Sequence, residues 1–205
     1  MIVKICGITR LEDAEAAVAA GASAIGFIFW PNSPRFVEPH RARKIAAALP
    51  PFVTAVGVFV NQPLDYVNGV ARLVGVGAVQ LHGDETPEFA ASVAAPVIKA
   101  LSVGADVRVW RSRVRLLLDV HDPVARGGTG RTIDWAAAAD LAAQRDILLA
   151  GGLTPDNVAD AVARVRPFGI DVSSGVERAP GIKDHQRLRA LFEAMHDCGH
   201  ITTRS

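Results

Sequence analysis

The chain has 205 residues, of which 50% are hydrophobic, and its 22 Lys and Arg residues nearly balance 21 Asp and Glu residues, for a formal net charge of +1. This composition can bury one substantial core and argues against a disordered chain. The balanced charge argues against a surface built to bind nucleic acid.

The sequence contains no recognisable targeting or membrane segment. A strand is predicted almost at the first residue, without the basic start and apolar core of a signal peptide, and no apolar run is long enough to span a bilayer. The two cysteines, Cys6 and Cys198, lie far apart and lack CxxC spacing, so neither a disulfide framework nor a zinc site is expected. Cys198 with His196 and His200 could form a metal cluster, but a solvated terminus is the better interpretation. We therefore expect a cytoplasmic protein without a metal or a membrane partner.

One unit repeats along the chain: a short β-branched strand, a loop of glycine and polar residues, and an Ala-rich amphipathic helix. This alternation predicts parallel strands joined by crossover helices. The predicted strands cover residues 2–6, 23–29, 53–60, 77–81, 97–100, 114–119, 146–150 and 169–172. The predicted helices cover residues 11–20, 39–49, 63–73, a segment that starts at 86–87, a short segment within 103–111, 134–143, a segment that starts at 154–155, and 183–196.

Turn residues mark several of the predicted helix ends. Gly21 is placed as a C-cap and Asp134 as an N-cap. Thr86-Pro87 and Thr154-Pro155 each offer a hydroxyl N-cap followed by proline at the first helical position. These signals set the ends of the helices between the strands.

Eight strands with about eight helices predict a single (β/α)8 TIM barrel with parallel strands, at the small end of the size range of that fold. Residues 1–196 would form the barrel domain and residues 197–205 a C-terminal tail. The runner-up is an open doubly wound sheet. In such a sheet the first strand usually leads into GxGxxG, whereas here it leads into Cys6-Gly7-Ile8.

Polar residues follow nearly every predicted strand, where a barrel gathers its chemistry on one rim. They are Cys6, Arg35, Asn61, His82, Asp119, Gly151-Gly152, Asp171 and Ser173-Ser174-Gly175. Chance can place two or three polar groups at strand ends, but one at almost every strand end indicates an active site.

Glycine-rich loops on this rim predict anion binding. Gly127-Gly128-Thr129-Gly130, Gly151-Gly152 and Ser173-Ser174-Gly175 follow the sixth, seventh and eighth strands. Glycine lets backbone N–H groups approach an anion, serine hydroxyls add donors, and the last two loops of a barrel often bind phosphate. Each glycine pair taken alone could equally be a tight turn.

Each candidate side chain also has a structural interpretation. Cys6 could be a small apolar core residue, or a reactive thiol at a strand end. Asp119 ends an apolar strand, where desolvation favours the protonated form that suits a general acid, but it could instead cap a neighbouring loop. Arg35 could grip a planar carboxylate in a bidentate manner or be an ordinary surface arginine. His82 could bind a ligand or be a satisfied polar residue near the rim.

Several longer motifs occur along the chain in a fixed order. They are Lys4-Ile5-Cys6-Gly7-Ile8-Thr9, Gly26-Phe27-Ile28-Phe29 with Ser33-Pro34-Arg35, Val79-Gln80-Leu81-His82-Gly83, Gly127-Gly128-Thr129-Gly130 with Asp134-Trp135, Leu149-Ala150-Gly151-Gly152-Leu153, and Asp171-Val172-Ser173-Ser174-Gly175-Val176-Glu177. In this order they resemble the phosphoribosylanthranilate isomerase family over nearly the whole chain.

This resemblance implies an enzyme of tryptophan biosynthesis without metal or organic cofactor. Its substrate would be N-(5-phosphoribosyl)anthranilate, which an Amadori rearrangement converts to 1-(2-carboxyphenylamino)-1-deoxyribulose 5-phosphate. It implies Cys6 as general base, Asp119 as general acid and Arg35 as ligand of the anthranilate carboxylate. His82 and Asp171 match substrate-binding positions, and the loops after the seventh and eighth strands would bind the phosphate. Residues 120–126 are less typical of the family.

Two other functions stay open at this point. A sister sugar-phosphate isomerase of the histidine pathway also performs an Amadori rearrangement, but it resembles this chain less because it has an aspartate base where Cys6 stands. A non-catalytic barrel that binds a phosphorylated ligand would be expected to lack an acid or a base, and both are present. The sequence leaves both a monomer and a homodimer open.

Overall fold

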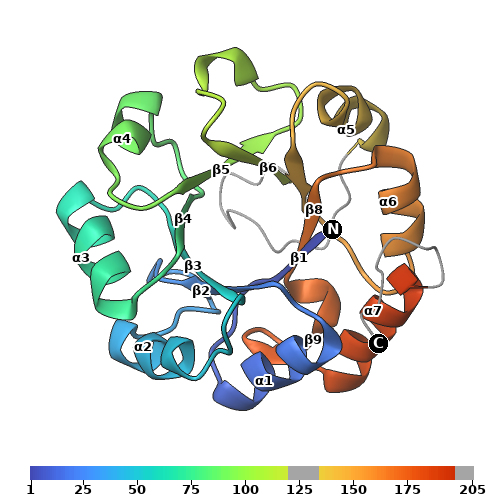
Figure 1. The fold of residues 1–205 in the computed structure, drawn as a ribbon, viewed down its shortest axis with the longest axis horizontal. Coiled ribbons are helices and arrows are strands. Elements are labelled where there is room, and N and C mark those ends of the chain that lie inside the picture. The colour runs from blue at the N-terminus through green and yellow to red at the C-terminus, as the bar shows by residue number, and fades with distance from the viewer. Residues whose placement is uncertain (120–133, 197–205) are drawn as a thin grey trace.

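The computed structural model describes residues 1–119 and 134–196, and these form a closed barrel of eight parallel strands in the order β1 to β8. The strands are β1 Ile2–Ile5, β2 Ala24–Ile28, β3 Thr54–Phe59, β4 Ala78–Leu81, β5 Val97–Ser102, β6 Arg115–Asp119, β7 Ile147–Leu149 and β8 Gly169–Val172. Figure 1 looks down the barrel and shows the strands as an inner ring surrounded by helices. The predicted (β/α)8 fold is confirmed.

The helices alternate with the strands around the outside, except between β5 and β6, where the described chain has only a 3-10 turn. They are α1 Leu11–Ala20, α2 Pro39–Ala47, α3 Leu64–Val74, α4 Pro87–Ser92, α5 Trp135–Ala142, α6 Val158–Val165 and α7 His185–His196. In residues 1–119 and 134–196, no helix combines the length and the hydropathy that a bilayer crossing requires. The predicted caps at Gly21 (φ 117°), Thr86 and Asp134 are confirmed, since Thr86 accepts from Phe89 N and Asp134 from Ala136 N.

Two hydrophobic layers follow from the alternation of side chains along each strand. The larger layer lies between sheet and helices and includes Ile5, Leu116 and Leu118. A smaller cluster of Ala100, Leu117, Leu148 and Ala150 lies inside the barrel, with Ile2 and Ile98 packed against it. On each strand, the residues between those of the outer layer therefore point into the barrel. Candidate site residues at these positions lie on the inner face of the sheet.

Three predicted helices differ from the structure. The segment 103–111 contains only a 3-10 turn, η1 Val107–Val109. The helix expected to start at Thr154-Pro155 begins at Val158, because the Asn157 side chain accepts from Thr154 N at 2.8 Å and donates to the Gly152 carbonyl at 3.0 Å. Thr154 is therefore not its N-cap.

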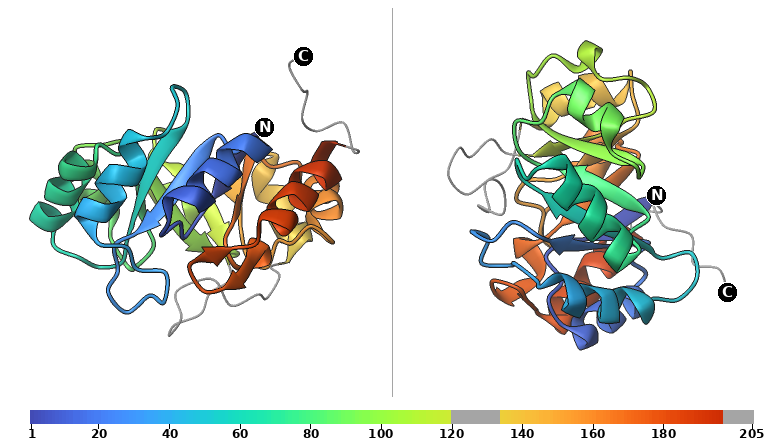
Figure 2. Two further views of the ribbon diagram at one scale, coloured as in Figure 1. Left: turned by 90° about the horizontal axis from the view of Figure 1, so that it is seen from below. Right: turned by 90° about the vertical axis from the view of Figure 1, so that its left-hand side faces the viewer.

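The third difference creates part of the rim. The last helix begins at His185 rather than Lys183, because Lys183 belongs to an antiparallel hairpin of β9 Glu177–Ala179 and β10 Ile182–Lys183. The hairpin follows the short 3-10 turn η2 Ser174–Val176. Figure 2 shows it at the end of the barrel opposite the N-terminus, which is the end where the strands finish.

The predicted loop Gly127-Gly128-Thr129-Gly130, the segment 120–126, Cys198, His200 and the predicted tail 197–205 lie outside the described residues.

Candidate active site

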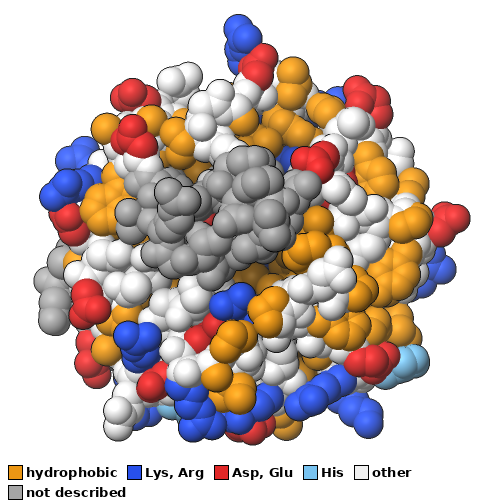
Figure 3. Space-filling model, turned by 180° about the vertical axis from the view of Figure 1, so that it is seen from behind, with side chains coloured by type: hydrophobic (Ala, Val, Ile, Leu, Met, Phe, Trp, Pro, Cys, Tyr) orange, Lys and Arg blue, Asp and Glu red, His pale blue; other side chains and the backbone are white. Residues whose placement is uncertain are grey.

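Strand alternation brings four predicted residues to the inner face of one rim. On β1, Ile2 packs in the interior cluster, so Lys4 and then Cys6 share its face. Asp119 shares a face with Leu117 on β6 by the same rule. Asp171 is paired in register with Lys4, and His82 follows β4 directly. Figure 3 shows the face opposite that of Figure 1, where Lys and Arg side chains are interspersed with Asp and Glu.

A small cavity joins the predicted acid to the predicted anion-binding loops. It is lined by Asp119, Ala150, Gly151, Gly152, Leu153, Asp171, Ser173 and Ser174. These residues come from the ends of β6, β7 and β8, which are neighbours in the barrel. Polar groups predicted from three separate stretches of sequence therefore surround one space.

The two glycines after β7 adopt backbone conformations that other residues rarely reach. Gly151 has φ 81° and Gly152 has φ 66°. The loop after β8 packs tightly against them, because a Cβ at Gly175 would overlap the carbonyl oxygen of Leu153. The predicted pair of phosphate loops thus forms a continuous wall of backbone with the Ser173 and Ser174 hydroxyls beside it.

Cys6 is almost fully buried beside these loops. The residue is 5% exposed, its N–H donates to the Val172 carbonyl at 2.9 Å, and its carbonyl accepts from Ser173 Oγ at 3.2 Å. Gly26 makes room for the sulfur, since a Cβ there would lie 2.8 Å from Sγ. Burial raises the pKa of Cys6 above its ordinary value, while the Lys4 ammonium opposes that rise.

Lys4 is a buried cation directly below the thiol. Its Nζ donates to Asp171 Oδ1 at 2.8 Å, and the Lys4 side chain is 1% exposed. Burial disfavours the ammonium, but Asp171 and the thiol outweigh that effect, so the pKa of Lys4 is raised. Lys4 therefore carries a positive charge that favours ionisation of Cys6.

Asp119 faces His82 across the mouth of the barrel. Asp119 Oδ2 lies 3.4 Å from His82 Nε2, and both side chains are mostly buried. The amide nitrogen of Gln80 lies 2.8 Å from His82 Nδ1. Because an amide nitrogen is a donor, Nδ1 accepts and Nε2 presents a proton to Asp119. His82 therefore lies beside the carboxyl group that the sequence predicts as an acid.

Arg35 reaches the rim from the loop after β2 and pairs with Glu177. Its Nε and Nη2 contact the two carboxylate oxygens at 2.8–3.0 Å, and Lys183 Nζ adds a second ion pair to Glu177 at 2.8 Å. Burial raises the pKa of Glu177, but Arg35 and Lys183 outweigh it and hold this pKa below its ordinary value. Within the described chain, Arg35 Nη1 donates to no protein acceptor, so this nitrogen keeps its hydrogen-bonding capacity for a second carboxylate.

Sequence reasoning missed Lys4, Gln80, Glu177 and Lys183 as contributors to the site. A charged residue within the apolar strand Ile2–Ile5 was a usable signal for Lys4. Lys183 was placed in a helix, so its pairing with Glu177 could not be foreseen. Gln80 and Glu177 stood in quoted motifs, but nothing in the sequence identified their partners.

Comparison with known proteins decides the family. The sequence profile described as N-(5'phosphoribosyl)anthranilate (PRA) isomerase matches residues 3–194. The chain belongs to this isomerase family. It is 50% identical over 206 residues to the N-(5'-phosphoribosyl)anthranilate isomerase of Pelobacter propionicus, covering 98% of this chain and 99% of the relative.

Solved structures of the isomerase family share the fold as well. Phosphoribosyl anthranilate isomerase from Thermus thermophilus has a TM-score of 0.87 at 43% identity, covering 96% of this chain and 99% of its own. Another phosphoribosyl anthranilate isomerase, in complex with reduced 1-(o-carboxyphenylamino)-1-deoxyribulose 5-phosphate, has a TM-score of 0.84 at 42% identity and covers 96% of this chain and 100% of its own. The resemblance seen in the sequence motifs is confirmed.

Proposed function

We propose that this isomerase converts N-(5-phosphoribosyl)anthranilate to 1-(2-carboxyphenylamino)-1-deoxyribulose 5-phosphate in tryptophan biosynthesis. The observation that carries the proposal is the cavity in which Asp119 meets the loops after β7 and β8, beside the buried Cys6. A related isomerase binds the reduced product of this reaction, which supports the same ligand here. We place the enzyme in the cytoplasm, as expected of amino-acid biosynthesis, with residues 1–196 as a barrel domain.

The reaction begins with opening of the sugar ring. Asp119 gives its proton to the furanose ring oxygen, the bond from C1 to that oxygen breaks, and the nitrogen lone pair forms a C1=N iminium. His82 orients Asp119 through Nε2. The ring oxygen becomes a hydroxyl group that keeps the proton, and Asp119 is left as the carboxylate.

The second step removes a proton from C2. Cys6, as the thiolate, takes that proton, and the electrons of the C2–H bond neutralise the iminium to give an enolamine. The enolamine then loses its C2 hydroxyl proton and gains one at C1, which yields the ketone. Lys4 acts as a positioning residue here, because its charge lowers the free energy of the thiolate without touching substrate.

Binding is divided between two ends of the site. The open end of Arg35 would hold the anthranilate carboxylate, with Glu177 fixing the guanidinium plane. Gly151, Gly152, Ser173, Ser174 and Gly175 would hold the phosphate through backbone N–H groups and hydroxyls. His82 and Asp171 would border the ribose. An arginine at one end of the site and glycine and serine loops at the other support a substrate with a carboxylate at one end and a phosphate at the other.

The test follows the fluorescence of N-(5-phosphoribosyl)anthranilate as it is consumed. Cys6→Ala and Asp119→Asn should each lower kcat by about 10²–10⁴-fold, the usual contribution of a general acid or base. Cys198→Ala and Asp140→Asn, which change the other cysteine and an exposed carboxylate on α5, are matched controls and should stay within about twofold. Near wild-type kcat in both site variants would refute the acid and base assignment. Loss of activity with a chelator would refute a metal-independent reaction.

A further inference from the structure

The outer ring of helices is thin between β5 and β6. In the described segment 97–119, only the 3-10 turn η1 connects these strands, and the neighbouring helix α4 has six residues. The outer face at the start of β5 and β6 is therefore covered by a loop rather than by a helix (Figure 1). A groove opens at this place.

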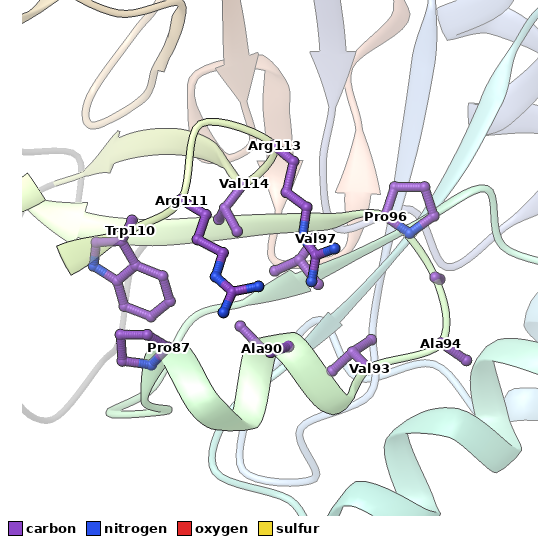
Figure 4. Close-up of a pocket in the computed structure, with 12 residues that line it drawn as sticks. Pro87, Ala90, Val93, Ala94, Pro96, Val97, Trp110, Arg111, Arg113 and Val114 are labelled. Carbon is purple, nitrogen blue, oxygen red and sulfur yellow. The ribbon is translucent and has the colours of Figure 1, made fainter. Parts of the chain in front are cut away.

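The groove lies between α4 and the residues that precede β6. Its volume is about 440 Å³, which falls within the range of roughly 300–1,000 Å³ typical of small-molecule sites. Ala90, Val93, Val97 and Val114 form its floor, and Trp110 closes one end (Figure 4). A groove of this size accommodates a small molecule.

One wall of the groove is fixed before any ligand arrives. Arg145 donates to four backbone carbonyls of that wall, those of Val107 at 3.1 Å, Trp110 at 3.0 Å, Arg111 at 3.2 Å and Val114 at 3.0 Å. At the other wall, the Asn68 side chain accepts from Ala94 N at 3.0 Å. A groove with fixed walls loses little conformational entropy when a ligand binds.

Two cations, Arg111 and Arg113, lie at the mouth of the groove. Arg111 and Arg113 are exposed, and neither forms an ion pair with any carboxylate in the described part of the chain. Figure 4 shows both side chains extending over the floor of the groove. Apolar walls with two unpaired guanidinium groups are complementary to a ligand that has an apolar body and a carboxylate.

We propose that this groove binds an aromatic carboxylate, with the ring against Val97 and Trp110 and the carboxylate between Arg111 and Arg113. The indole of Trp110 offers an aromatic contact that an aliphatic chain would not use. The groove is separate from the reaction centre. It lies on the outer side of the barrel sheet, whereas Cys6 and Asp119 lie on the inner face of that sheet.

The test is a titration of the full-length ¹⁵N-labelled protein with 2-naphthoate, followed by NMR. We expect shifts of the backbone amides in residues 90–97 and 110–114 and of the Trp110 indole N–H. The neutral isostere 2-naphthamide should bind at least about tenfold more weakly, because it cannot pair with the arginines. Mapping by residue separates this groove from any binding at the catalytic rim.

Matched arginine variants complete the experiment. Arg111→Gln and Arg113→Gln should each weaken naphthoate binding about fivefold, and Arg43→Gln on α2 should leave it unchanged. Unchanged melting temperature and isomerase activity verify that the groove variants are folded. The proposal is overturned if the groove amides do not shift up to about 5 mM naphthoate, if naphthamide binds equally well, or if Arg43→Gln weakens binding as much as the groove variants do.

Discussion

Glu177→Gln tests how the buried charges beside the rim support the site. Glu177 contacts both Arg35 and Lys183, and the side chains of Glu177 and Lys183 are 4% and 0% exposed. Glutamine keeps the shape and one oxygen acceptor but removes the negative charge, so two buried cations lose their counter-charge. Breaking a buried ion pair in this way costs about 3–5 kcal/mol of folding free energy.

The lower end of this range gives the expected shift in melting temperature. For a chain of this length, about 3 kcal/mol corresponds to about 6–12 °C. The matched control is Asp160→Asn, because the ion pair of Asp160 with Arg164 at 2.7 Å is exposed on α6. Surface pairs of this kind contribute little, and we expect the control to melt within about 2 °C of wild type.

The pH dependence gives the assay a second reading. Because the pKa of Glu177 is lowered by folding, its stabilising effect is complete above the ordinary carboxyl pKa of 4.5 and is lost as pH falls through the lowered value. The difference in melting temperature between wild type and Glu177→Gln should therefore be constant from pH 7 to about pH 5 and shrink below that.

Kinetics show whether the same contact orients Arg35. Glu177→Gln should raise KM about five- to tenfold, with kcat within about threefold, because Arg35 loses the partner that fixes its plane. Arg35→Ala, which removes the charged hydrogen bond itself, should weaken substrate binding by about 1.5–3 kcal/mol. A Glu177→Gln enzyme with wild-type KM and a melting temperature within 2 °C of the Asp160→Asn control would refute this reasoning.

Two further substitutions probe the thiol and the phosphate loops. Lys4→Met should move the limb of the kcat/KM profile that reports the ionisation of Cys6 to higher pH. The reason is that the Lys4 charge opposes the rise in the pKa of Cys6. Adding Asp171→Asn should restore stability and move the limb part of the way back, because the Asp171 charge raises the pKa of Cys6 less than the Lys4 charge lowers it. An unmoved limb in Lys4→Met would exclude Lys4 as the group that tunes the thiol. Gly175→Ala should raise KM about tenfold, because its Cβ would overlap the Leu153 carbonyl and separate the two loops. Gly69→Ala on α3 is its control, since a Cβ there has open space, and equal KM values in the two variants would argue against a phosphate role for the loop.

The sequence by itself determined the barrel and the candidate residues of its rim. Strands and helices alternate in the chain, and their hydrophobic patterns are local, so eight units could be counted without coordinates. The capping residues Gly21, Thr86 and Asp134 were readable for the same reason, because each acts within four residues of itself. The predictions at Thr154 and Lys183 were wrong, because a hydrogen bond to the Asn157 side chain replaced the expected cap at Thr154 and pairing with β9 kept Lys183 out of the helix.

Only the tertiary structure decided which groups act on one another. Lys4 meets Asp171 and Arg35 meets Glu177 across separations of 167 and 142 residues, and no periodicity in a single sequence encodes such pairs. The ionisation of Cys6 depends on the same contacts. Its strand position was evident from Lys4-Ile5-Cys6-Gly7, but the balance between burial and the Lys4 charge arises only when the barrel closes and water is excluded.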